Sequence, residues 1–457
     1  MEVGFMRKKR IVALGLIAIL TVTNIVGCGK ASSSDSESSN GTKAENQPTV
    51  EAETKEPENE NSVTPETGEK VTLNYFAWNE GDYLQDIVDA YNAQNNGVEV
   101  KLTVVAGSDY DDKLVTMLAG SNDIDLYSMR SIAQLSQMAS TGNLENITDL
   151  IQEKGVDVSA YGNGFADSEI DGKFYALPYR AQSYALFYNK KVFEEQNVPY
   201  PENITWEEYA EIAKQLTGEF DGKKVYGGYL PEWLFAPFMT RQMRAGIEDD
   251  DLTATRAWLE QLNRFYNVDK SHLSYSEMVS TGADYLTYLC SGQAAMLPNG
   301  DWCVSDINKL LESDPSLNDT FEMGIALLPQ LSEDSDPLTL GGVSTFIGIN
   351  ASTSHVEEAF DFTCYLAGEE GEKIIASYGM LPAYVSDSII DTYKEVVGEG
   401  AEYLLDVDKI SEGASFDKFN ELQSIYMEER ELYLIGEQTI DDTIDNFTER
   451  RAELLGK

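Results

Sequence analysis

Residues able to do chemistry are present in this sequence, but not at the spacings that enzymes use. There is no G-x-S-x-G motif for a serine nucleophile, no G-x-x-x-x-G-K-[ST] phosphate loop, no C-x-x-C and no H-E-x-x-H. The two histidines, His272 and His355, are too few for a histidine-built metal centre, and neither stands in a recognisable nucleophile motif. With 79 acidic residues, some pair of carboxylates always lies close, so such a pair does not identify a glycosidase. The sequence therefore predicts no catalytic residue, no metal ion and no cofactor.

Aromatic side chains are what this sequence supplies in quantity: 25 Tyr, 17 Phe and 5 Trp. Tyr and Trp suit sugar rings, because the C–H faces of a sugar stack on aromatic rings while its hydroxyls need hydrogen-bond partners. A single tyrosine is more often a core residue with its hydroxyl at the surface. Trp78, Trp233 and Trp302 each stand beside polar, Gly or Pro residues, and for them a ligand contact and a structural role are equally open.

The charge balance excludes some partners. Against 33 Lys and Arg the sequence has 79 Asp and Glu, a formal net charge of −46, while 42% hydrophobic residues indicate a globular protein. Long-range repulsion opposes binding to nucleic acid or to an anionic lipid surface. The same charge supports an alternative hypothesis, a binding protein for a cationic solute such as a polyamine, although net charge usually serves solubility.

The N-terminus has the pattern of a targeting segment. Arg7–Arg10 is basic, and Ile11–Val22 is an apolar stretch too short for a permanent membrane span. The stretch ends in Ile25-Val26-Gly27-Cys28, which resembles the lipobox of bacterial lipoproteins, where the cysteine is acylated and becomes the new N-terminus. An ordinary secretory peptide with an incidental cysteine is the alternative. We expect residues 1–27 to be a lipoprotein signal peptide and Cys28 to carry the lipid.

The segment after Cys28 has the composition of a tether. Residues 29–70 contain no Leu, Ile, Met, Phe, Trp or Tyr, so nothing there can offset the entropy lost on ordering. We expect residues 28–70 to be a lipid-anchored, disordered tether that contacts the membrane through the lipid only. Residues 71–457 are more than one hydrophobic core usually organises, which favours two lobes.

Alternating strands and helices open the folded part. Residues 71–77, 98–104 and 124–127 have strand patterns, and residues 83–94 and 113–119 have helix patterns. This β-α-β-α-β order predicts a mostly parallel sheet flanked by helices, and in such sheets ligands bind beyond the carboxyl ends of the strands. The residues that follow these strands are therefore candidates for ligand contacts: Trp78-Asn79-Glu80, Gly107 to Tyr110 and Tyr127 to Arg130.

Five longer segments carry a further pattern: Tyr175–Lys190, Pro201–Glu208, Gly292–Trp302, Leu340–Ile349 and Gly379–Ala383. In this order they resemble the extracellular solute-binding proteins of carbohydrate ABC importers, the family that includes the maltodextrin-binding proteins. Each motif is weak alone, and their common order over most of residues 71–457 makes the resemblance specific.

The resemblance implies a two-lobed α/β fold of the periplasmic-binding-protein type, each lobe a mostly parallel sheet flanked by helices. The expected lobes are residues 71–184 with 330–370, and residues 188–326 with 376–457. The crossings between them would form a hinge. A ligand that touches both lobes would then hold the closed form.

The resemblance also implies ligand-binding residues in the cleft between the lobes. Trp78, Asn79 and Glu80 match the first ligand loop of the family, and Tyr127 and Arg130 lie in its third. The resemblance is therefore a second reason, besides their position at strand ends, to expect these residues to contact the ligand.

Later segments add to this set. Gln182 stands where the maltodextrin branch carries a carboxylate, Asp301-Trp302 match the aromatic loop of the second lobe, and Trp233 is a further aromatic platform. Gly342 permits close backbone approach, either to a ligand or to a neighbouring strand. The complete set of expected ligand-binding residues is Trp78, Asn79, Glu80, Tyr110, Tyr127, Arg130, Tyr179, Arg180, Gln182, Trp233, Asp301, Trp302, Gly342 and Ser344.

Two local patterns predict structure. Thr205-x-x-Glu208 has the spacing of a helix capping box, which makes Trp206 structural. Cys290, Cys303 and Cys364 are odd in number, and we expect them mostly as buried small apolar residues, with a Cys290–Cys303 bridge as an open alternative.

Together these observations predict a monomeric, non-enzymatic carbohydrate receptor that is lipid-anchored at the extracytoplasmic face of a bacterial cell membrane. Its ligand, expected to be an oligosaccharide, would pass to the permease subunits of an ABC transporter. Two alternatives remain besides the cationic solute. A surface glycan-degrading enzyme would need two carboxylates flanking the cleft, and an adhesive lipoprotein would lack a deep cleft.

Overall fold

The computed structural model describes residues 70–78, 81–120, 124–220, 222–414, 416 and 418–456. The expected signal peptide, Cys28 and, apart from Lys70, the expected tether lie outside the described residues, as do Asn79 and Glu80. All described residues belong to one compact unit. Across these residues, no helix is both long enough and apolar enough to cross a membrane.

A mixed sheet runs through the described part of the chain. Its strands lie in the order β2-β1-β3-β9-β4-β7, with β10 paired to β9 and β8 paired to β4, while β5 and β6 form a separate hairpin. The strand bounds are β1 Val71–Trp78, β2 Val98–Val105, β3 Leu126–Met129, β4 Ala176–Asn189, β5 Gly218–Phe220, β6 Lys223–Val225, β7 Met296–Gly300, β8 Met323–Ala326, β9 Leu338–Ile349 and β10 Asp408–Ile410.

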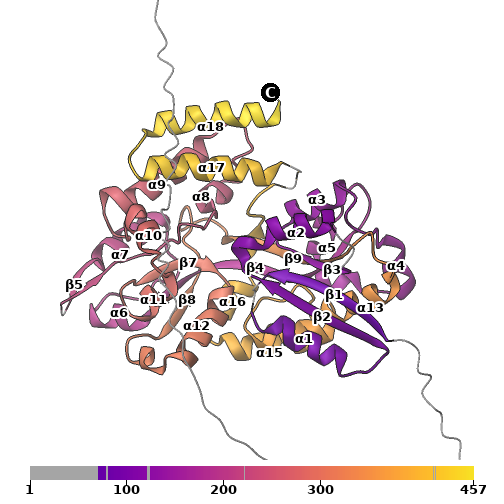
Figure 1. Cartoon of the computed structure of the whole chain (residues 1–457). Helices are drawn as coiled ribbons and strands as arrows, with labels where there is room; N and C mark the ends of the chain where they lie inside the picture. Colours follow the sequence, from indigo (N-terminus) through magenta and orange to yellow (C-terminus); the bar gives the residue numbers. More distant parts are fainter. Residues whose placement is uncertain are drawn as a thin grey trace, which may run out of the picture. The chain divides into compact units, whose positions relative to one another are not determined.

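Helices connect and cover these strands, and Figure 1 shows α17 and α18 side by side near the C-terminus. Their bounds are α1 Tyr83–Asn92, α2 Tyr110–Gly120, α3 Ile132–Ser140, α4 Thr148–Lys154, α5 Asn163–Asp167, α6 Lys190–Glu195, α7 Trp206–Gln215, α8 Phe238–Gln242, α9 Thr253–Asn263, α10 Tyr275–Thr281, α11 Tyr285–Cys290, α12 Trp302–Ser313, α13 Val356–Leu366, α14 Glu369–Ser377, α15 Asp387–Val397, α16 Ala401–Leu405, α17 Phe419–Leu434 and α18 Ile440–Leu455. Short helical turns are η1 Gly107–Asp109, η2 Val158–Tyr161, η3 Arg264–Val268 and η4 Pro315–Asp319.

The predicted capping box is confirmed at the start of α7. The Thr205 hydroxyl accepts a hydrogen bond from the Glu208 N–H, and the Glu208 carboxylate accepts one from the Thr205 N–H. Trp206, the next residue, is buried and its indole N–H donates to the Gln242 side-chain oxygen at 2.8 Å. Its structural role is therefore confirmed too.

The predicted strand and helix order at the start of the fold is confirmed, and β1 pairs in parallel with both β2 and β3. The expectation of a mostly parallel sheet needs correction beyond these strands. β9 runs antiparallel to β3, and β4 runs antiparallel to β9, β7 and β8. Within the described residues, every antiparallel pair of this sheet involves one of the two long strands β4 and β9.

The long strand β4 joins two hydrophobic cores. Its residues up to Ser183 pair with β9, and from Tyr184 on they pair with β7 and β8. Figure 1 shows β1, β2 and β3 on one side of β4 and β7 and β8 on the other. The first core includes Leu73, Leu177 and Phe360, and the second includes Phe187 and Met296 among others. The lobe boundaries drawn from the sequence stay a prediction.

Candidate functional site

A cavity of about 130 Å³ lies beside the strands that join the two cores. Its walls come from the start of α3 and the turn before it, from the middle of β4 and β9, from Phe235, from residues 411–414 and from the start of α17. Three residues expected at the site, Arg130, Gln182 and Ser344, line it. The fold thus brings residues distant in sequence around one hollow.

Arg130, which lines the cavity, lies against two aromatic rings beside it. The Arg130 guanidinium lies 5.2 Å from the centroid of the Trp78 ring and 5.3 Å from that of Tyr110, and its Nη2 donates to the Gly107 carbonyl at 3.0 Å. The Asp111 carboxylate lies 3.5 Å from the same Nη2. Arg130 is thereby held at the end of β1 while one third of its side chain stays exposed.

The opposite wall carries a carboxylate that the sequence did not reveal. The Glu412 carboxylate accepts hydrogen bonds from Gln182 Nε2 at 3.3 Å, from the Tyr184 hydroxyl at 3.1 Å and from the Ala236 N–H at 3.2 Å. Burial raises the pKa of Glu412 above its usual value. Only the pairing of β10 with β9 brings this residue to the cavity, and among 79 acidic residues no sequence signal marks it.

Two predicted tryptophans form an aromatic group beside this carboxylate. The Trp302 ring lies 5.5 Å from the ring of Tyr184 and 6.4 Å from the ring of Trp233, which in turn lies 5.8 Å from Tyr285. Trp302 packs against both cores, and Trp233 is 48% exposed. Through Tyr184 and Glu412, this aromatic group is continuous with the cavity wall.

Asp301 and Arg180 are not available to a ligand in this structure, contrary to the expectation. Asp301 is fully buried and Arg180 is 6% exposed. The Asp301 carboxylate accepts hydrogen bonds from Arg180 Nη2 at 3.2 Å, from the Ser183 N–H at 3.3 Å and from the Leu381 N–H at 2.9 Å. The pair fastens the end of β7 to β4 and to the segment after α14, which is a structural role.

Three tyrosines expected to touch ligand are core residues instead. Tyr110, Tyr127 and Tyr179 have no exposed surface. Tyr110 stacks on Phe76, the Tyr127 hydroxyl donates to the Asn143 carbonyl at 3.2 Å, and the Tyr179 hydroxyl lies 2.9 Å from Ser128 Oγ. These rings, at the start of α2 and on β3 and β4, have no surface for a ligand in this structure, contrary to the expectation.

The glycines and Ser344 divide between two faces of the joining strands. Ser344 lines the cavity, whereas Gly342 lines a separate apolar hollow with Ala181. A Cβ atom at Gly342 would meet nothing within 4 Å, whereas one at Gly341 would lie 2.3 Å from the Gln182 carbonyl oxygen, so the close approach to a neighbouring strand is at Gly341. Asn79 and Glu80 lie outside the described residues.

No nucleophile site is accessible at His272. Its ring contacts the Tyr209 hydroxyl at 3.0 Å and Ser271 Oγ at 3.1 Å, and all three residues are buried. Burial lowers the pKa of His272 to about 3, which keeps the ring neutral. Within the described ranges no cluster of three or more His, Cys, Asp or Glu side chains could hold a metal ion.

The three cysteines among the described residues, Cys290, Cys303 and Cys364, are free thiols. Cys290 and Cys303 are buried, as expected for small apolar residues, and Cys364 is partly exposed. The alternative of a Cys290–Cys303 bridge is therefore not realised in this structure.

Known proteins resemble this chain in sequence and in fold. The arabinooligosaccharide-binding protein of Halalkalibacterium halodurans is 25% identical over 323 residues, which cover 67% of this chain and 69% of that protein. The multiple sugar-binding protein of Streptococcus mutans is 22% identical over 326 residues, which cover 67% of this chain and 74% of that protein.

Solved structures share the fold. An ABC substrate-binding protein of Listeria monocytogenes in complex with cycloalternan superposes with a TM-score of 0.72 at 23% identity, over 85% of this chain and 99% of that one. The model of the family described as bacterial extracellular solute-binding protein matches residues 86–391. This match spans more than half of the chain, and the fold agrees with it. The chain therefore belongs to the bacterial extracellular solute-binding proteins.

Proposed function

We propose that this protein is the carbohydrate receptor of an ABC importer and that its ligand is an oligosaccharide. The observation that carries the proposal is one cavity lined by the Arg130 guanidinium, which lies 5.2 Å from the centroid of the Trp78 ring, and by the Glu412 carboxylate with its amide partner Gln182. The names of the similar proteins, which bind multiple sugars and arabino-oligosaccharides, support the same ligand class.

The chemistry of these walls suits a sugar. Each hydroxyl both donates and accepts, so it can donate to the Glu412 carboxylate and accept from the amide of Gln182 or the guanidinium of Arg130. The exposed ring of Trp233 and the half-buried ring of Trp302 can stack on the C–H faces of the sugar. A micromolar Kd corresponds to about −8 kcal/mol, which a few such contacts can supply.

Transport requires a change of shape that signals occupancy. In our proposal the two expected lobes move about the joining strands, and a ligand that contacts both walls stabilises the closed form. The closed receptor, a monomer anchored through acylated Cys28 at the extracytoplasmic face of the cell membrane, then delivers its ligand to the permease subunits.

Calorimetry of the purified mature protein tests this function. The panel contains monosaccharides, malto-, arabino- and manno-oligosaccharides, and spermidine. We expect heat of binding with at least one oligosaccharide series and none with spermidine. Binding of spermidine with silence across every sugar would overturn the proposal in favour of a cationic solute, and release of reducing ends from a bound glycan would identify an enzyme.

A further inference from the structure

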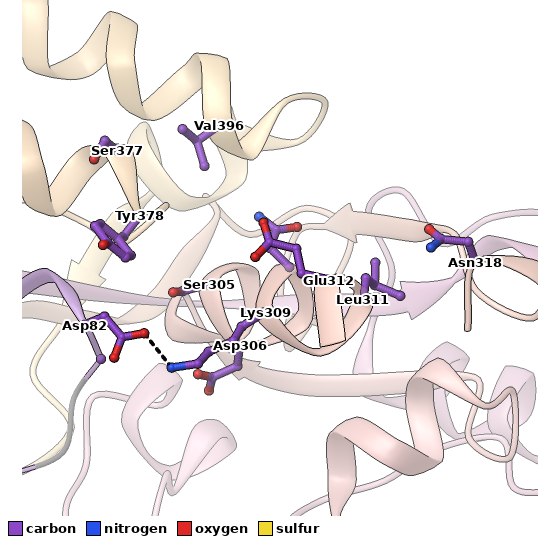
Figure 2. Close-up of a pocket in the computed structure, with 12 residues that line it drawn as sticks. Asp82, Ser305, Asp306, Lys309, Leu311, Glu312, Asn318, Ser377, Tyr378 and Val396 are labelled. Atoms are coloured by element: carbon purple, nitrogen blue, oxygen red, sulfur yellow. Dashed lines mark hydrogen bonds and ion pairs between the residues drawn. The ribbon is translucent and has the colours of Figure 1, made fainter. Parts of the chain in front are cut away.

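A second and larger hollow lies beside α12. It has a volume of about 710 Å³, within the roughly 300–1,000 Å³ of typical small-molecule sites, whereas the cavity at the joining strands falls below that range. Figure 2 shows its two sides: Asp82 and Tyr378 on one, and Ser305, Lys309 and Glu312 on the other. We call this hollow the α12 groove.

The α12 groove separates elements that pack on different cores. Asp82 precedes Tyr83, a residue of the first core, and Tyr378 packs against that core. The side chain of Ile307 on α12 belongs to the second core. A ligand in the groove would therefore contact both halves of the fold, as one in the cavity would.

Polar side chains in the α12 groove are available for hydrogen bonds. Ser305, Asn308 and Glu312 follow one another at spacings of three and four residues, so they share one face of α12. Their side chains have no hydrogen-bond or ion-pair partner within the described part of the chain. These three residues offer one hydroxyl, one amide and one carboxylate to the groove, and the ring of Tyr378 lies across from them.

An ion pair crosses the α12 groove. The Lys309 ammonium lies 2.8 Å from the Asp82 carboxylate, the contact drawn as a dashed line in Figure 2, and the two side chains are 66% and 71% exposed. Such an exposed pair, screened by water, contributes little to stability. A ligand with hydroxyl groups can replace it at little cost, so it does not block the groove.

Helix α12 connects the α12 groove to the aromatic group. It begins at Trp302, whose ring contacts Tyr184, and the Tyr184 hydroxyl binds Glu412 at the cavity. From Trp302 to Glu312 the helix rises roughly 15 Å at 1.5 Å per residue. Helix α12 thus leads from the aromatic group to the groove, and the hydrogen bond between Tyr184 and Glu412 links that group to the cavity.

We propose that the α12 groove is a second part of the binding site, which takes additional rings of a neutral oligosaccharide whose first rings lie at Trp302 and Glu412. The proposal rests on the function proposed above. It adds that the receptor selects longer chains, with Ser305, Asn308 and Glu312 as hydrogen-bonding residues.

The dependence of affinity on chain length tests the proposal. Calorimetry compares two-ring and five-ring members of the malto-, arabino- and manno-oligosaccharides with the mature protein. For the series that binds, we expect the five-ring sugar to bind about 10-fold tighter or more. Ser305→Trp fills the groove and should abolish this ratio while the two-ring Kd stays within twofold. Ser313→Trp, an equal change at an exposed position of α12 outside the groove, should preserve the ratio.

A milder variant keeps the test valid if Ser305→Trp does not fold. Asn308→Ala removes one polar group and should weaken only the five-ring sugar. Equal affinities for both lengths in the unmodified protein, or equal losses for both lengths in the variants, would overturn the extended site and leave sugar binding intact. Silence with every sugar would instead overturn the proposed function and this inference with it.

Discussion

Two carboxylates beside β4 accept the same number of hydrogen bonds, but only one of them lines a cavity. Asp301 accepts hydrogen bonds from Arg180, Ser183 and Leu381, and Glu412 accepts three from Gln182, Tyr184 and Ala236. Asp301 is fully buried, whereas Glu412 lines the cavity. A carboxylate with three hydrogen-bond donors thus joins segments of the fold at Asp301, and at Glu412 it lines the candidate ligand site.

The two carboxylates also differ in the charge of the groups that donate to them. Asp301 faces the buried guanidinium of Arg180, while the three donors to Glu412 are neutral groups. Burial raises the pKa of both carboxyls, and the Arg180 charge opposes that rise at Asp301. A carboxylate without a close cation gains more from a new hydrogen-bond donor, so Glu412 is the better acceptor for a sugar hydroxyl.

The largest effect should come from breaking the buried pair. Asp301→Asn leaves the buried Arg180 guanidinium without this carboxylate, and we expect the free energy of unfolding to fall by about 3–5 kcal/mol. Chemical denaturation measures it, with Asp391→Asn, an exposed position on α15, as the control. A loss below about 1 kcal/mol would show that the pair does not fasten the strands.

The two arginines should separate affinity from stability. Arg130→Ala removes a group from the cavity wall, so sugar affinity should fall about 10- to 100-fold while the free energy of unfolding changes by less than about 1 kcal/mol. Arg180→Ala should do the reverse, with a large loss of stability. Calorimetry and denaturation of both variants give the comparison, and matched losses of stability would remove the distinction drawn between them.

Replacing Glu412 by its neutral isostere should weaken binding less. Glu412→Gln loses one charge-assisted hydrogen bond to the ligand, about 1.5 kcal/mol or roughly 10-fold in Kd, and should not lower stability because the cost of burying the charge disappears. Glu421→Gln, an exposed position on α17, is the control for calorimetry. An unchanged Kd in Glu412→Gln would exclude contact between this carboxylate and the ligand.

The smallest effect is a pH dependence. Because the folded pKa of Glu412 is raised, the native state binds more protons than the unfolded chain between the ordinary and the raised pKa, so stability falls as pH rises through that window. Denaturation at several pH values should show a shallower fall in Glu412→Gln than in the unmodified protein, by less than about 1.4 kcal/mol per unit of pKa shift. Sugar affinity should rise over the same window, since the ionised form is the better acceptor.

The sequence predicted elements that depend on local pattern. The strands and helices from β1 to β3 and the capping box at Thr205 follow from alternation, apolar stripes and one residue spacing. It also named Trp78, Arg130, Trp233 and Trp302 as separate candidates, and the structure places Trp78 beside Arg130 and Trp233 beside Trp302. Strand ends and aromatic motifs are local features, which is why they could be found.

The remaining site residues depended on contacts between distant segments. Glu412 reaches the cavity because β10 pairs with β9, some seventy positions earlier in the chain. No residue pattern near Glu412 in the sequence indicates this pairing. The burial of Tyr110, Tyr127 and Tyr179 likewise depends on which distant segments pack against them.

By itself, the sequence determined the α/β class, the first strands and helices, and which aromatic and basic residues stand at strand ends. Only the tertiary structure decided which polar groups are buried as fasteners, as with Asp301 and Arg180, and which line a cavity, as with Glu412 and Arg130. The physical reason is that burial and strand pairing are properties of the packed whole, whereas propensity and periodicity act within a few residues.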